Sequence, residues 1–187
     1  MKNLAILVSG RGSNMRALVE AAEVADAPYR VVLVASDRPD CAGIAWAAER
    51  GLPVFALART GLARDAHEAG IEAALREAGA DFIALAGYMR VLSPDFVGRW
   101  AGQIVNIHPS LLPKYKGLDT HARAIEAGDK IAGCTVHLVT AELDSGEVLG
   151  RAVVPILPGD SAETLAKRVL AAEHRLYPRL LAEYVNQ

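Results

Sequence analysis

The chain has 187 residues, of which 52% are hydrophobic and 22% charged, and its formal net charge is −2 at pH 7. It is long enough to bury a core and too apolar to be disordered. Its basic residues are scattered and no apolar run reaches membrane-spanning length, which argues against nucleic-acid and membrane partners. The apolar run Leu4–Val8 is too short for a signal peptide, so we expect a soluble cytoplasmic protein. Cys41 and Cys134 are far apart and fit neither a disulfide framework nor a metal site.

Apolar runs alternate with helical patterns in the first half of the chain. The expected strands are Leu4–Val8, Val31–Ala35, Pro53–Leu57, Phe82–Ala86 and Gln103–Ile107. The expected helices between them are Met15–Ala25, Cys41–Arg50 and Arg64–Ala78. Because these strands are apolar on both faces, we expect a parallel sheet that helices cover.

The pattern changes after Gly117. A short helix is expected at Thr120–Ala127, two strands of a hairpin-like pair at Ala132–Thr140 and Glu147–Ile156, and a long closing helix at Ser161–Tyr184. The prediction is an α/β fold with a single domain over residues 1–187. Its doubly wound, mostly parallel sheet has helices on both faces and an antiparallel addition near the C-terminus.

The segment "SGRGSN" joins the first strand to the first helix. Its glycines allow close backbone approach, and Ser13 and Asn14 stand at a helix N-terminus, which favours an anion such as a phosphate. The alternative is a tight turn in which Ser13 is a simple N-cap. A dinucleotide fingerprint needs a third glycine or alanine where Met15 stands, although Asp37 occupies the place of a ribose-binding acid.

The segment "NIHPSLLPKYKG" follows the fifth expected strand. Residues two apart on a strand face the same way, so Asn106 and His108 should project together at its carboxyl end, where parallel α/β sheets bind ligands. An Asn amide can donate to an oxyanion, and a protonated His can add charge there and later deliver a proton. The pair suits attack on a carbonyl by direct transfer between two substrates.

A catalytic imidazolium usually requires a carboxylate nearby. Asp144, in the turn between the two late strands, is the candidate, with Glu142 and Glu147 as rivals. The other four histidines have plainer interpretations. His67 and His174 are expected at helix surfaces or edges, His121 at the start of a short helix, and His137 on a strand face beside Thr135, where packing is favoured over lining a site.

Several long stretches match one enzyme family. They are "SGRGSN", "LAGYMRVLSPDFV", "IVNIHPSLLPKYKG", "THARAIEAGD", "GCTVHLVTAELDSGEV" and "AEHRLYP". On these residues the chain resembles, nearly end to end, the glycinamide ribonucleotide transformylases, a branch of the folate-dependent formyltransferases. "NIHPSLLP" is shared by the wider group and identifies only the chemistry.

The resemblance implies formyl transfer from 10-formyltetrahydrofolate, as co-substrate, to the amine of 5′-phosphoribosylglycinamide. It implies that Asn106, His108 and Asp144 are catalytic, that Gly12, Ser13, Asn14 and Glu173 bind the ribonucleotide, and that Arg64, Met89, Arg90, Val91 and Leu92 bind the folate. No metal is implied. The chain departs from the family pattern at Lys116, where some relatives have proline, at Asp119, where histidine is common, and at Ser145, where glycine is frequent.

Three rival functions remain to be separated. Methionyl-tRNA formyltransferases share the Asn-His stretch but have an added C-terminal domain and a basic character. Formyltetrahydrofolate deformylases have an N-terminal regulatory domain, for which a first strand at residue 4 leaves no room. The rival from another class is a non-catalytic nucleotide-binding module that uses Gly10, Gly12 and Asp37. The sequence does not give the oligomeric state.

Overall fold

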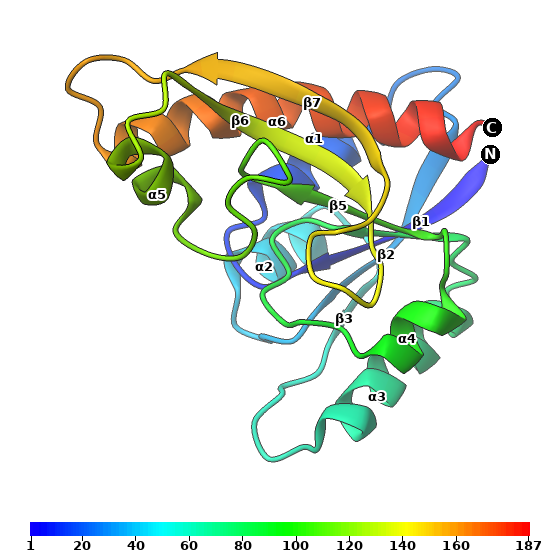
Figure 1. Cartoon of the computed structure of the whole chain (residues 1–187). Helices are drawn as coiled ribbons and strands as arrows, with labels where there is room; N and C mark the ends of the chain where they lie inside the picture. The colour runs from blue at the N-terminus through cyan, green and yellow to red at the C-terminus, as the bar shows by residue number, and fades with distance from the viewer.

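The computed structural model describes residues 1–187 and contains one seven-stranded sheet (Figure 1). Its strands are β1 (Lys2–Val8), β2 (Tyr29–Ser36), β3 (Val54–Ala56), β4 (Phe82–Leu85), β5 (Ile104–His108), β6 (Ile131–Leu138) and β7 (Val148–Pro155). They lie in the order β3-β2-β1-β4-β5-β6-β7. The first five run parallel, whereas β6 is antiparallel to β5 and β7 to β6. The predicted sheet, with its antiparallel addition, is confirmed.

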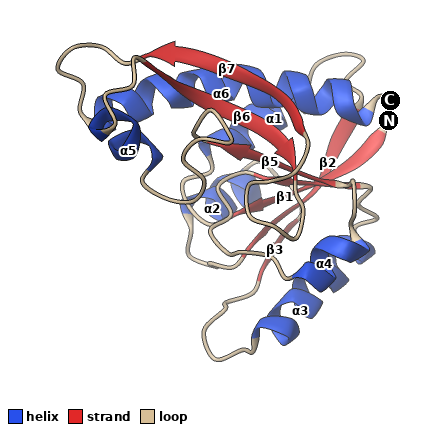
Figure 2. Ribbon diagram, viewed as in Figure 1, coloured by secondary structure: helices blue, strands red, loops and turns tan.

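Helices cover both faces of this sheet (Figure 2). They are α1 (Ser13–Ala22), α2 (Ala42–Glu49), α3 (Arg64–Glu77), α4 (Pro94–Arg99), α5 (Thr120–Glu126) and α6 (Ala162–Val185). One core cluster joins one face to α1, α2 and α6, and a second joins the other face to α3 and α4. In Figure 1 the long strands β6 and β7 lie along α6. The sheet therefore lies between two layers of helices, as predicted from strands that are apolar on both faces.

The sequence pattern missed one helix and placed most element boundaries one to three residues away from those observed. Helix α4 has only six residues, too few for a visible period, although Ser93 caps it by accepting a hydrogen bond from Phe96 N–H and Pro94 opens it. Helix α1 begins two residues earlier than expected, directly after Gly12. Strand β5 ends one residue later, because His108 still pairs with β6.

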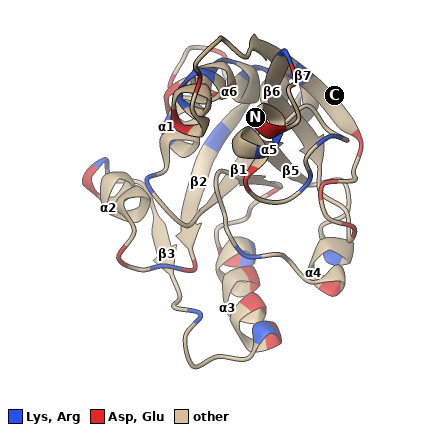
Figure 3. Ribbon diagram, turned by 60° about the vertical axis from the view of Figure 1, so that its left-hand side comes forward, with Lys and Arg blue, Asp and Glu red and all other residues tan.

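Charges of both signs are interspersed on the surface. Figure 3 shows acidic and basic residues mixed along α3, for example, where Arg76 pairs with Glu72. None of the helices combines the length and the apolar character that crossing a bilayer requires.

Candidate active site

Strand β5 turns alternate side chains to opposite faces. Val105 and Ile107 are buried in the cluster that contains α1 and α6, whereas Ile104 belongs to the cluster under α3 and α4. Asn106 and His108 therefore share the face of Ile104, as the two-residue spacing predicted. They lie farther along the strand, opposite His137 and Thr135 of β6. The edge of the sheet thus presents an amide and an imidazole on one side.

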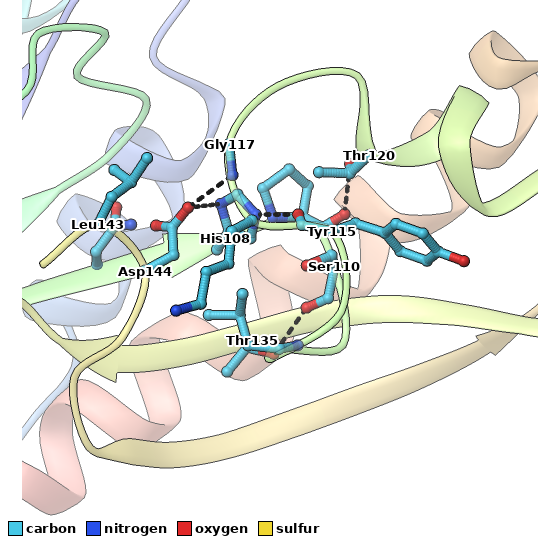
Figure 4. A network of polar contacts seen from close by, with 12 residues as sticks. His108, Ser110, Tyr115, Gly117, Thr120, Thr135, Leu143 and Asp144 are labelled. Carbon is cyan, nitrogen blue, oxygen red and sulfur yellow. Dashed lines mark hydrogen bonds and ion pairs between the residues drawn. The ribbon is translucent and has the colours of Figure 1, made fainter.

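His108 is buried and both of its ring nitrogens face oxygen atoms (Figure 4). Nε2 lies 2.9 Å from the Tyr115 carbonyl oxygen, which can only accept, so Nε2 donates. Nδ1 lies 3.5 Å from Asp144 Oδ2. A ring protonated on both nitrogens satisfies both neighbours, because the carboxylate then faces an N–H instead of a lone pair. The surroundings of His108 accommodate an imidazolium.

Asp144 lies between two histidines. Its Oδ2 faces His108 and accepts a hydrogen bond of 2.9 Å from Gly117 N–H, while its Oδ1 lies 3.7 Å from His137 Nε2. Its side chain is only 6% exposed, whereas that of Glu142 is 79% exposed and Glu147 is also exposed. Burial and distance therefore select Asp144 from the three acidic candidates.

His137 has a more specific place than the packing role that the sequence favoured. Its Nδ1 lies 2.8 Å from Leu138 O and must donate to that carbonyl. Burial lowers the pKa of His137, which the hydrogen bond to Leu138 and the charge of Asp144 only partly oppose. The neutral ring therefore offers a lone pair at Nε2, to which Asn106 Nδ2 donates over 3.1 Å. This contact orients the Asn106 amide and leaves its second N–H without a protein partner.

The glycine loop after β1 is open to an anion. Gly12, at φ 74°, is the N-cap of α1, and no side chain caps the helix. The structure excludes the alternative in which Ser13 is a simple N-cap, since Ser13 is the first helical residue and the free N–H groups of the first turn remain available. A Cβ at Gly12 would lie 2.9 Å from Met15 Cε and 3.1 Å from Gly43 Cα, and the positive φ also favours glycine at this position.

Asn14 joins this loop to α6. Its Nδ2 donates to Glu173 Oε2 over 2.7 Å, and both residues are buried. Burial raises the pKa of Glu173, and the Asn14 hydrogen bond partly opposes the rise. A groove between α1 and α6 begins at Ser13 and is lined by Arg16 and His174. The four residues predicted to bind the ribonucleotide thus come together at one end of α1.

The segment predicted to bind folate lies after β4. Arg64, at the start of α3, donates from Nη2 to Val91 O over 2.6 Å and so fixes this segment. Leu92 is buried in the core, whereas Met89 and Val91 are 61% and 58% exposed. Exposed apolar side chains beside a guanidinium suit a flat ring with a carboxylate tail.

Asp37 is not free to bind a ribose. It is 2% exposed, it accepts a hydrogen bond of 2.6 Å from Ser9 Oγ, and Arg59 lies 3.7 Å from its other oxygen. Ser9 Oγ also accepts from Met89 N–H over 2.9 Å. Asp37 therefore supports the segment after β4, and the rival nucleotide-binding module loses its acidic residue.

The structure also places the other histidines and cysteines that the sequence analysis named. His67, expected at a surface or edge, is fully buried, and its Nε2 lies 2.8 Å from Leu57 O, so that prediction is wrong. Cys41 and Cys134 are both buried, and neither forms a disulfide. No group of three or more His, Cys, Asp or Glu side chains is arranged to hold a metal ion.

Comparisons with known proteins agree with this geometry. The family model described as "Formyl transferase" matches residues 2–181. The phosphoribosylglycinamide formyltransferase of Haemophilus influenzae is 41% identical over 97% of this chain and 86% of its own length. The trifunctional purine biosynthetic protein adenosine-3 of Drosophila melanogaster is 45% identical over 99% of this chain, which spans only 14% of that protein.

The similarity extends to solved structures. The crystal structure of a phosphoribosylglycinamide formyltransferase from Brucella melitensis is 49% identical and superposes with a TM-score of 0.95, covering 100% of this chain and 96% of its own. Glycinamide ribonucleotide transformylase 1 from Symbiobacterium toebii is 38% identical with a TM-score of 0.96, over 100% and 88% of the two chains.

Proposed function

The chain belongs to the formyl transferase family, and on that premise we propose that it transfers a formyl group from 10-formyltetrahydrofolate to the amine of 5′-phosphoribosylglycinamide. The observation that carries the proposal is the continuous array of Asn106, His137, Asp144 and His108 at the carboxyl end of β5. In this array an amide donor lies near an imidazole whose surroundings accommodate its charged form. The array contains no serine or cysteine nucleophile. Such a site suits direct transfer between two bound substrates.

In the proposed reaction, the neutral amine attacks the formyl carbon and the carbonyl oxygen becomes an oxyanion. The second N–H of Asn106 and the charged ring of His108 stabilise that oxyanion. The formyl oxygen takes the place of the Tyr115 carbonyl at His108 Nε2. The bond from the formyl carbon to the folate nitrogen then breaks. The amine loses one proton and the departing nitrogen gains one, with His108 as the carrier.

Asp144 serves this step by holding the ring of His108 through Nδ1. Because Gly117 N–H donates to the same carboxylate oxygen, Asp144 has little freedom to turn away. We assign to it the role of stabilising the imidazolium, and to His137 the role of orienting Asn106.

We assign one substrate to the loop that follows β1 and the other to the segment that follows β4. The N-terminus of α1, with Gly12, Ser13 and Asn14, receives the phosphate, and Glu173 receives the ribose hydroxyls. The segment Met89–Leu92, with Arg64, receives the folate. We further propose that residues 1–187 act as one domain on small molecules. The cytoplasmic location stays a prediction.

The test is a spectroscopic assay with a 10-formyl-dideazafolate donor and glycinamide ribonucleotide. Deformylated donor should accumulate only when both substrates are present. Donor consumption without the ribonucleotide would indicate a deformylase instead. Calorimetry adds a second discrimination, since a dinucleotide-binding module should bind NAD and ignore the folate.

A further inference from the structure

Two residues of the segment between β5 and α5, on either side of Lys116, contact the catalytic groups. Tyr115 O accepts from His108 Nε2, and Gly117 N–H donates to Asp144 Oδ2, as Figure 4 shows on opposite sides of the His108 ring. Lys116, between them, donates from Nζ to Ser145 Oγ and lies 3.5 Å from Glu142 Oε1. The Tyr115 and Gly117 contacts use the backbone, so the Lys116 contact alone depends on the kind of side chain.

The turn that Lys116 reaches carries Asp144 in an unfavourable backbone conformation. Asp144 has φ 49°, in the left-handed region that non-glycine residues disfavour. Ser145 Oγ donates to Leu143 O over 3.0 Å and, through its lone pair, accepts from Lys116. One hydroxyl therefore closes the turn around Asp144 and also ties it to the facing loop.

The loop end of this contact is anchored as well. Arg123 of α5 donates from Nη1 to the Lys116 carbonyl over 2.7 Å and to Leu118 O over 3.1 Å. Arg123 fixes the Lys116 backbone relative to α5, and the Lys116 side chain in turn contacts the turn that carries Asp144. Glu142 adds little, because its side chain is 79% exposed and its ion pair is screened by water.

We propose that Lys116 and Ser145 form a cross-loop pair that positions Asp144 against His108, which makes both of them positioning residues for the transfer. The proposal rests on the proposed function and deepens it.

A double-mutant cycle tests the pair. Lys116→Met keeps the aliphatic stem and removes the donor, Ser145→Ala removes the hydroxyl, and the double variant removes both. Each single variant should lower kcat for formyl transfer by about 3- to 10-fold, the effect of losing one hydrogen bond, with both KM values unchanged. The double variant should be no slower than the slower single variant, because both changes break the same contact.

Two controls separate positioning from a general effect. Lys114→Met changes a lysine of the same loop that pairs with Asp129 instead, at 2.9 Å, and should keep the wild-type kcat. Lys116→Arg retains a donor and should recover most of the activity. Losses that multiply in the double variant, or wild-type kcat in either single variant, would overturn the proposal. Absence of formyl transfer in the wild-type protein would instead refute the proposed function.

Discussion

Exchange of Asn106 for aspartate removes a hydrogen-bond donor without a change of shape. The Asn106 amide is held by neutral His137, to which Nδ2 donates over 3.1 Å. An aspartate has no N–H to offer to that lone pair or to an oxyanion. Loss of one oxyanion donor costs about 10²–10³ in kcat, so Asn106→Ala, which removes the donor alone, should show a decrease of that size.

The aspartate also adds a charge next to Asp144. Both carboxylates would lie on His137 Nε2, at 3.1 and 3.7 Å, and hence at most about 7 Å from each other. At an effective dielectric constant of about 20, their repulsion at that separation is about 2 kcal/mol, and it is larger if they lie closer. Protonation of His137 relieves it, since an N–H at Nε2 then faces both acids. The variant should therefore raise the pKa of His137, against the burial that lowers it in the wild-type protein.

Two measurements check this reasoning. Steady-state assays should give Asn106→Asp a kcat about 10³–10⁴-fold below wild type, lower than that of Asn106→Ala because the new charge also repels the oxyanion. Nuclear magnetic resonance titration of the histidine rings should show His137 taking up its proton at higher pH than in the wild type. If Asn106→Asp retained more than a tenth of the activity, or if the His137 titration did not move, the assigned contact would be wrong.

The remaining predictions concern four other residues. His108→Ala should lower kcat about 10²–10⁴-fold in the same assay, because the acid–base group is lost. Asp144→Asn should lower kcat in that assay, because a neutral amide no longer balances the charge of the His108 ring, and an unchanged kcat would contradict the role proposed for Asp144. Gly10→Ala places a methyl group where no protein atom lies within 4 Å, so it should raise KM for the ribonucleotide with an unchanged melting temperature. Glu173, whose pKa burial raises, contributes stability at acidic pH that is lost as the pH rises through that higher value. Glu173→Gln should therefore flatten thermal stability measured from pH 4 to pH 8.

Gly12 is a poorer position at which to probe the phosphate site than the sequence suggests. From the sequence, Gly12→Val is expected mainly to raise KM for the ribonucleotide, because a side chain would block the approach of the phosphate. In the structure, the added Cβ meets Met15 and Gly43, and φ 74° strains any L-residue. The variant would thus disturb the loop itself, whereas Gly10→Ala leaves it intact.

Local pattern was sufficient to predict strand β5 and the shared face of Asn106 and His108. The apolar run, the two-residue spacing of Asn106 and His108, and the position at the carboxyl end of a parallel strand all follow from rules that operate within a few residues. Asp144 could be named only through the family resemblance, since Glu142 and Glu147 are equivalent in sequence. The structure separates them through burial, which depends on the fold of the whole chain.

His137 shows what the sequence lacked. Its alternation with Thr135 placed it on one strand face, but its partner depends on the pairing of β6 with β5, which sets it opposite Asn106. The two side chains that meet there are 31 positions apart in the chain, and the antiparallel register that joins them is a tertiary property that no local rule supplies. The same holds for Tyr115 and Gly117, whose contacts with His108 and Asp144 use only backbone atoms.

Backbone strain is distributed unevenly around the site. Four non-glycine residues have positive φ, and three of them, Tyr115, Asp119 and Asp144, lie in the two loops that face each other across His108. Each such residue costs about 1–2 kcal/mol, so contacts between the loops must maintain these conformations. Asn106 and His108 stand on an unstrained strand between two loops that depend on each other. The array therefore keeps its donors fixed on the sheet, whereas Asp144, which supports them, lies on a turn that the contacts with the facing loop hold in place.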